Sequence, residues 1–126
     1  MSVIDSPTSA LVRLALDATS LRHLALANNI ANASSPGYAP QRVNFEQQLG
    51  LARQALAAGG RAELPDLAGV KAFVEEGAPL VAGSPAATLD LEMVRMAQNT
   101  LQYQALLRAS SRLGTIMATA INEGKK

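Results

Sequence analysis

Apolar and small residues, followed by two asparagines, repeat at alternating intervals of three and four along the first third of the chain. The repeating positions are Leu11, Leu14, Ala18, Leu21, Ala25, Asn28 and Asn32. Such intervals keep side chains on one side of an α-helix, as in a coiled coil. Thr8 or Ser9 can accept hydrogen bonds from the first unpaired amide groups. The pattern therefore predicts a helix over residues 9–33 that packs along a neighbour.

The end of this helix is marked by Ser35, Pro36 and Gly37. A residue that precedes proline is disfavoured in the helical region, so Ser35 cannot easily continue the helix. Proline followed by glycine suits the two central positions of a type II turn, the second of which requires a positive φ. The chain is therefore expected to turn at Pro36-Gly37.

The middle of the chain has a weaker pattern. Residues 38–46 carry Val43 and Phe45 at strand-like spacing, and residues 47–58 are predicted to form a short alanine-rich helix. Residues 59–88 hold most of the glycine and proline, with one alternating segment, 70–75, that indicates a strand. The middle is therefore expected to be a loop or a small β-hairpin.

Residues 89–122 are predicted to form a second long helix with two apolar series. The first series is Met93, Met96, Tyr103, Leu107, Met117 and Ile121; the second is Val94, Ala97, Leu101, Ala105, Ala109, Leu113, Ile116 and Ala120. Together they are wider than one partner helix can cover. Part of this surface could stay exposed in a two-helix hairpin, since scattered exposed apolar residues are normal. The pattern favours oligomerisation, because a contiguous exposed stripe would be a large patch.

The start of the second helix carries polar residues suited to a helix N-terminus. Thr88 or Asp90 can cap the first amide groups. Glu92 is expected in the first turn, where a carboxylate complements the helix dipole. These residues support a helix that begins at Leu89.

Composition agrees with one mainly helical domain over residues 1–126. The 126 residues are 48 % hydrophobic, but they include only two Phe, two Tyr and no Trp, so few side chains are bulky enough to fill a globular interior. We predict a coiled-coil-like hairpin of two long terminal helices, 9–33 and 89–122, joined by an irregular middle, 34–88. The net charge of +1 gives no reason to expect a nucleic acid or an anionic membrane as partner.

The residue types that carry enzyme chemistry are scarce. His23 is the only histidine, and it lies within the first predicted helix without a serine-containing elbow around it. The chain has no cysteine, its acidic residues show no clustered ligand spacing, and Gly59-Gly60 lacks the context of a phosphate loop. We expect no enzyme activity, no metal, no cofactor and no small-molecule substrate.

Asn28, Asn29 and Asn32 stand together at the end of the first helix. At intervals of three and four, their amides are expected to share one side of the last turns. Each amide can donate and accept hydrogen bonds, which suits binding to the backbone or the amides of a neighbour. Helix fraying is the alternative, because asparagine is common near helix ends.

The stretch from Ala15 to Glu46 resembles the N-terminal signature of the bacterial flagellar rod and hook proteins. The core of that signature is an ANNIANxxTPGY pattern, matched here by Asn28, Asn29, Ile30, Ala31, Asn32, Pro36, Gly37 and Tyr38. Ser35 stands where threonine is usual and keeps the hydroxyl group.

The stretch from Leu89 to Ile121 is similar to the C-terminal end of the proximal rod members of the same family. The similarity rests on Asp90, Glu92, Ala97, Asn99, Leu101, Tyr103, Gln104, Ala105 and Ile121. Glu92-Met93-Val94 is also similar to a sister rod protein, so two members of the family stay open. The two similar stretches cover about half of the chain, and the middle matches weakly.

The resemblance implies a non-enzymatic subunit of a helical tube that transmits torque and conducts exported subunits. It implies export by the flagellar type III route, in agreement with a first segment that lacks the features of a cleaved signal peptide. Implied partners are copies of the chain, other rod proteins, and components of the export gate and basal ring. From another class, a soluble helical adaptor or export chaperone could also bury a long apolar stripe in a partner.

Pattern and resemblance together give the residues expected at subunit contacts. They are Leu14, Leu21, Asn28, Asn29, Asn32, Pro36, Gly37, Tyr38, Met96, Leu101, Tyr103, Gln104, Leu107, Leu113, Met117 and Ile121.

Overall fold

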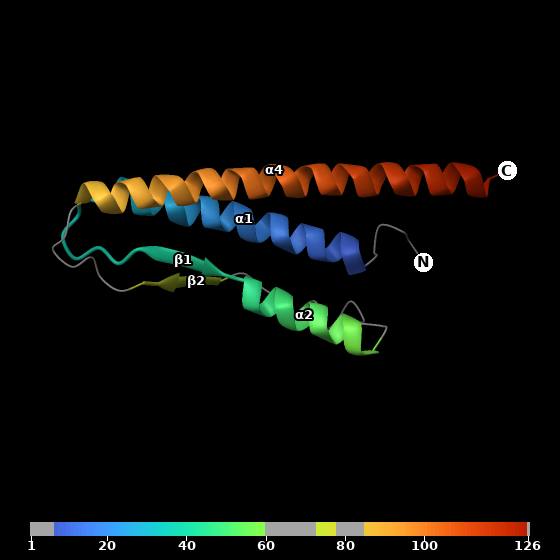
Figure 1. Cartoon of the computed structure of the whole chain (residues 1–126), viewed down its shortest axis with the longest axis horizontal. Helices are drawn as coiled ribbons and strands as arrows, with labels where there is room; N and C mark the ends of the chain where they lie inside the picture. The colour runs from blue at the N-terminus through green and yellow to red at the C-terminus, as the bar shows by residue number, and fades with distance from the viewer. Residues whose placement is uncertain (1–6, 60–72, 78–84, 126) are drawn as a thin grey trace.

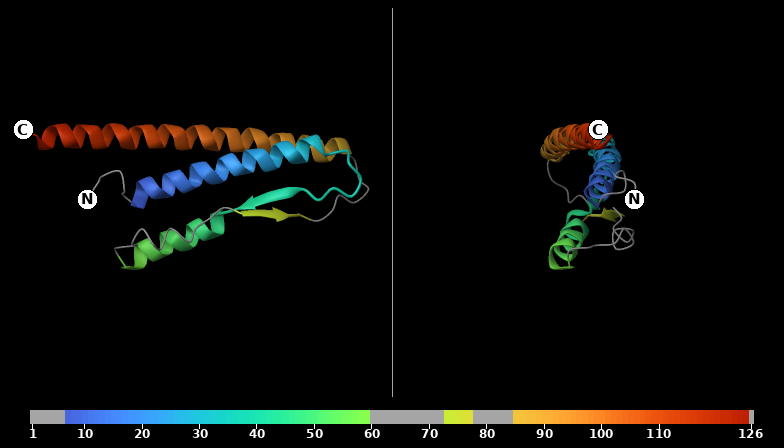
Figure 2. Two further views of the ribbon diagram at one scale, coloured as in Figure 1. Left: turned by 180° about the vertical axis from the view of Figure 1, so that it is seen from behind. Right: turned by 90° about the vertical axis from the view of Figure 1, so that its right-hand side faces the viewer.

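The computed structural model is an elongated arrangement of layers (Figure 1), and it describes residues 7–59, 73–77 and 85–125. Helix α4 (Pro85–Gly124) lies along helix α1 (Pro7–Ala31). On the other side of α1 lie a two-stranded sheet and helix α2 (Glu46–Gly59) (Figure 2). The predicted class is confirmed: the fold is mainly α, with two long terminal helices packed together and a small antiparallel sheet between them in sequence.

Both long helices begin earlier than predicted, and each begins at a proline. Proline suits the first helical position, because it lacks only an amide hydrogen that would have no partner there. Helix α1 starts at Pro7, so Thr8 and Ser9 lie inside its first turn. Helix α4 starts at Pro85, so Glu92 lies beyond the first turn, contrary to the prediction.

The predicted turn at the end of α1 is present. The Ser35 carbonyl accepts a hydrogen bond from the Tyr38 amide at 3.2 Å, and Gly37 has a φ of 74°. A positive φ at the second central position defines a type II turn and favours glycine. This turn leads the chain from α1 into the sheet.

The sheet is an antiparallel pair of β1 (Gln41–Asn44) and β2 (Phe73–Glu76), with Gln41 opposite Glu76. The Gly77 amide donates to the Pro40 carbonyl at 2.7 Å and extends the pairing by one position. Of the predicted strand at 70–75, residues 70–72 lie outside the described part of the chain. Helix α2 corresponds to the short helix predicted at residues 47–58.

The interior of the described molecule is small, and its largest fully buried side chains are polar. One core cluster contains Ala15, Ala18 and Phe45, with Leu49 and Leu106 packed against it. The bulkiest side chains with less than 2 % exposure are Glu92, Asn29 and Thr19. Small alanines let the layers approach closely, so hydrogen bonds between layers carry much of the specificity of this packing.

The two long helices differ in length. Helix α1 has 25 residues and α4 has 40, which correspond to roughly 37 and 60 Å. They run antiparallel: Asn29 near the end of α1 contacts Glu92 near the start of α4, and Thr19 contacts Asn99 further along. The last turns of α4 therefore extend past the described part of α1, as Figure 1 shows.

Candidate assembly site

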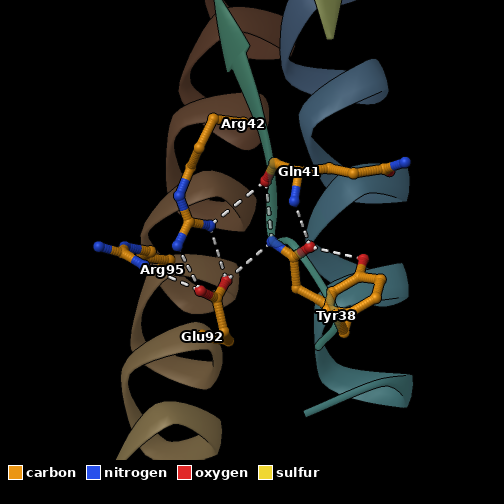
Figure 3. Close-up of polar contacts among 6 residues, drawn as sticks. Tyr38, Gln41, Arg42, Glu92 and Arg95 are labelled. Atoms are coloured by element: carbon orange, nitrogen blue, oxygen red, sulfur yellow. Dashed lines mark hydrogen bonds and ion pairs between the residues drawn. The ribbon is translucent and has the colours of Figure 1, made fainter. Parts of the chain in front are cut away.

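The side chain of Asn29 connects α1 to β1 and α4. Its partners Tyr38, Gln41 and Glu92 are labelled in Figure 3. Its Nδ2 donates to the Gln41 carbonyl at 2.9 Å and to Glu92 Oε2 at 3.2 Å. Its Oδ1 accepts from the Gln41 amide at 2.7 Å and from the Tyr38 hydroxyl at 2.9 Å. Every donor and acceptor of this carboxamide is therefore used, at a position that is only 2 % exposed.

Glu92 holds the other half of the same network. Arg42 Nη1 and Nη2 approach the two carboxylate oxygens at 3.0 and 2.5 Å, a two-point pairing between β1 and α4. Arg95 Nη1, three residues along α4, donates to Glu92 Oε1 at 2.9 Å. The guanidinium groups keep partial contact with solvent, with 36 % and 38 % side-chain exposure, while the Glu92 side chain has 2 %. A buried carboxylate is tolerated here because several donors neutralise it.

This environment changes the ionisation of two groups. Burial opposes ionisation of Glu92, but the hydrogen bonds from Arg42 and Asn29 and the charges of Arg42 and Arg95 lower the pKa of its carboxyl below 4.5. Burial also raises the pKa of the Tyr38 hydroxyl above 10.0, and the Glu92 charge raises it further. Tyr38 therefore stays a neutral donor to Asn29 at physiological pH.

A second connection fixes the far end of β1 to α1. Arg22 Nη2 donates to the Val43 carbonyl at 2.9 Å and pairs with the carboxylate of Glu46. Its guanidinium carbon also lies 5.3 Å from the centre of the Phe45 ring, within the range of a cation–π contact. Burial opposes the effect of the Arg22 hydrogen bond on Glu46, and the net result is a lowered pKa of that carboxyl.

Side chains of α1 thereby cover the outer edge of β1. Gln41 and Val43 lie opposite β2 residues at the non-hydrogen-bonded positions of the ladder, so their backbone N–H and C=O groups point away from that strand. Asn29 pairs with both backbone groups of Gln41, and Arg22 pairs with the Val43 carbonyl. An edge strand covered in this way does not offer those groups to another chain.

The interface of α1 and α4 contains a further buried amide and an open groove. Asn99, 3 % exposed, donates from Nδ2 to the Thr19 carbonyl at 2.9 Å, while its Oδ1 is buried without a partner. A groove of about 300 Å³ lies next to it, lined by Thr19, Ser20, His23, Leu24, Asn99, Thr100 and Tyr103. Leu24 is 61 % exposed at its wall.

Much of α4 presents apolar side chains to solvent. The large apolar residues of α4 that are more than a third exposed are Leu91, Met93, Val94, Leu101, Tyr103, Leu107, Ile116 and Ile121. The most exposed are Leu101 at 67 % and Ile116 at 64 %. A second helix could bury such a surface.

The residues expected at subunit contacts fall into three groups by their exposure in the structure. Leu101, Tyr103, Gln104, Leu107, Ile121, Asn28, Pro36 and Gly37 are exposed, whereas Leu14, Leu21, Asn32, Tyr38, Met96, Leu113 and Met117 are half-buried. Asn29 alone is fully buried within its own chain.

The three asparagines do not act together. Asn29 faces the sheet and α4, whereas the Asn32 amide donates to the Asn28 carbonyl at 2.9 Å and satisfies the end of its own helix. Asn28 contacts Gln41 only at a long 3.4 Å. Successive helical residues are rotated by about 100°, so Asn29 cannot share the direction of Asn28. The buried seam of α1 runs through Asn29, and the predicted placement of all three amides on one side is wrong.

The sequence interpretation did not find Arg42, Arg22 or the pairing role of Glu92. A signal was present at Glu92: it lies at helical intervals from Leu89, Met96 and Asn99, and these positions form the stripe that faces α1. The apolar series did not reveal this stripe because Glu92 and Asn99 interrupt it.

No protein-family model matches the chain, and a search of the curated proteins finds no match. Within the described ranges, no helix has both the length and the hydropathy needed to cross a membrane. Residues 7–59, 73–77 and 85–125 also include no group of three or more side chains placed to hold a metal ion.

Proposed function

We propose that the chain is a structural subunit of the proximal rod of the bacterial flagellar basal body, of the FlgB type. The observation that carries the proposal is the exposed apolar surface of α4, with Leu101 and Ile116 most exposed, on a helix pair that carries the rod-type motif. In a rod, neighbouring subunits would bury this surface in a head-to-tail arrangement that does not close. The sister protein FlgC is the alternative within the family.

The network around Asn29 and Glu92 supports a mechanical role. It ties the end of α1, the turn and β1 to the start of α4, by contacts within the chain alone. A subunit of a torque-transmitting tube needs its terminal helices in a fixed relation to the segment that joins them. Asn28 and Asn32 of the motif, unlike Asn29, keep contact with solvent and remain candidates for contacts with a neighbour.

Complementation of a deletion strain tests the proposal. The double variant Leu101→Glu/Ile116→Glu should fold, as judged by its helical circular dichroism, but should not restore swimming, because it places charges in subunit contacts. The matched control is Gln54→Glu, an exposed position on α2, which should restore swimming. Normal swimming of the folded double variant would contradict the proposal.

A helical adaptor or export chaperone is the alternative from another class, since it could use the same exposed surface to bind its client. The two differ in their final location. A rod subunit remains in basal bodies purified away from the cytoplasm, and mass spectrometry should detect it there. A chaperone would be absent from those particles while remaining in the cytoplasmic fraction.

A further inference from the structure

One stripe of α4 has a symmetric spacing of residues about Leu101. The stripe consists of Asp90, Val94, Ala97, Leu101, Ala105, Arg108 and Arg112, all of them exposed. Its ends, Asp90 and Arg112, each lie 11 residues from Leu101, which is three helical turns. Val94 and Arg108 lie seven residues away, and the two alanines lie four residues away. We call this set the outward stripe.

The stripe is complementary to itself when two copies run antiparallel. With Leu101 of both copies at the centre, Asp90 of each copy lies opposite Arg112 of the other, and Ala97 lies opposite Ala105. The small alanines let the helices approach closely, and the stem of Arg108 can cover Val94. Two equivalent ion pairs would then close the two ends of the contact.

The charges at the ends of the outward stripe form no ion pair with the described residues of their own chain. Among the described residues, no ion pair involves Asp90, Arg108 or Arg112. Arg108 and Arg112 are four residues apart on one helix, an interval at which like charges repel. Among the large apolar residues that the structure describes, Leu101 has the highest exposure. Complementary charge and a central apolar contact thus point to the same occupant, a second copy of the chain.

We propose that the chain forms an antiparallel dimer through the outward stripe, with its two-fold axis at Leu101. Subunits of a head-to-tail tube all point the same way, so this dimer is a different state from the assembled one. It covers Leu101, the most exposed of the large apolar residues described on α4, together with Val94. The inference does not depend on the proposed function, because any role of the chain leaves the self-complementarity unchanged.

Charge reversal in the purified chain tests the ends of the stripe. Sedimentation should give a dimer for the wild type and about tenfold weaker dimerisation for Asp90→Arg or Arg112→Asp, because each variant replaces two attractive pairs by repulsive ones. An equimolar mixture of the two variants should restore the dimer, since each end of the contact would again join an arginine to an aspartate. Asp17→Arg, which changes net charge equally at an exposed α1 position, is the control and should dimerise like the wild type.

Cysteine crosslinking tests the register, because the chain has no native cysteine. Ala97→Cys and Ala105→Cys should form a disulfide when mixed and not when oxidised separately, since two copies of residue 97 would lie about 12 Å apart along the axis. A wild type that stays monomeric at low salt, unchanged dimerisation of both charge variants, or equal crosslinking of Ala97→Cys alone would overturn the proposal. Each of these outcomes leaves the rod function to its own genetic test.

Discussion

The carboxamide of Asn29 takes the place of a neighbouring strand beside Gln41. It donates to the Gln41 carbonyl at 2.9 Å and accepts from the Gln41 amide at 2.7 Å, as a paired backbone would. The remaining donor and acceptor reach Glu92 and the Tyr38 hydroxyl. One side chain therefore fixes the turn after α1, the first strand and the long C-terminal helix in one arrangement.

Replacement of Asn29 should destabilise the chain more than replacement of its neighbour. Asn29→Leu keeps the side-chain size but leaves the partners of the amide without hydrogen bonds, so the free energy of unfolding should fall by about 2 kcal/mol. Asn28→Leu, at an exposed position with only a long contact, should change it by less than about 0.5 kcal/mol. Urea unfolding followed by circular dichroism measures both values. Equal effects of the two variants would contradict the role assigned to Asn29.

Removal of the Glu92 charge should be costly, because the carboxylate is bound by two arginines. Glu92→Leu should lower the free energy of unfolding by about 2 kcal/mol. This loss is smaller than the usual loss when one partner of a fully buried ion pair is removed, because both guanidinium groups keep contact with water. Arg95→Gln should cost less than about 1 kcal/mol, since Arg42 still holds the carboxylate at two points. An Arg95→Gln variant as unstable as Glu92→Leu would contradict the prediction that the Glu92 carboxylate contributes more to stability than its contact with Arg95.

Low pH should weaken the pairing of Glu92 with its two arginines. The pKa of Glu92 is lower in the folded chain than its ordinary value of 4.5, so the unfolded chain binds this proton first as pH falls. The stabilisation by Glu92 is therefore complete at neutral pH and is lost as pH drops below about 4.5 towards the folded pKa. Unfolding of wild type and Glu92→Gln at several pH values should show a steeper acid loss for the wild type. Parallel curves for the two chains would be inconsistent with a lowered pKa.

The turn at Gly37 should be sensitive to an added methyl group, although that group would meet no other atom. Gly37 has a φ of 74°, where a side chain strains the backbone by about 1 kcal/mol or more. Gly114→Ala is the matched control, because an alanine inside α4 also meets no atom and favours the helix by about 1 kcal/mol. Thermal unfolding should show opposite shifts for the two variants, and a stabilising Gly37→Ala would contradict the assigned turn.

The long helices and the turn could be predicted because their signals are local. Apolar repeats identify the helices, and Pro36-Gly37 identifies the turn. Helix starts were missed by a few residues because serine and threonine near each start resembled caps, while Pro7 and Pro85 were the first helical residues.

The polar network could not be predicted in the same way. Arg42 and Glu92 are 50 positions apart, and no local pattern relates a strand residue to a helix residue at that separation. The burial of Asn29 could not be predicted for a related reason. The buried side of α1 packs against both the sheet and α4, so its position on the helix depends on the sheet as well as on α4. The apolar repeat through Asn28 and Asn32 describes the helix but does not identify its most buried side.

The most direct measurement for the central claim is electron microscopy of basal bodies from a strain that lacks this reading frame, beside a strain restored with a plasmid copy. If the chain is a proximal rod subunit, the deletion strain should have membrane rings without rod and hook, and restoration should return both. Basal bodies with an intact rod and hook in the deletion strain would contradict the structural role.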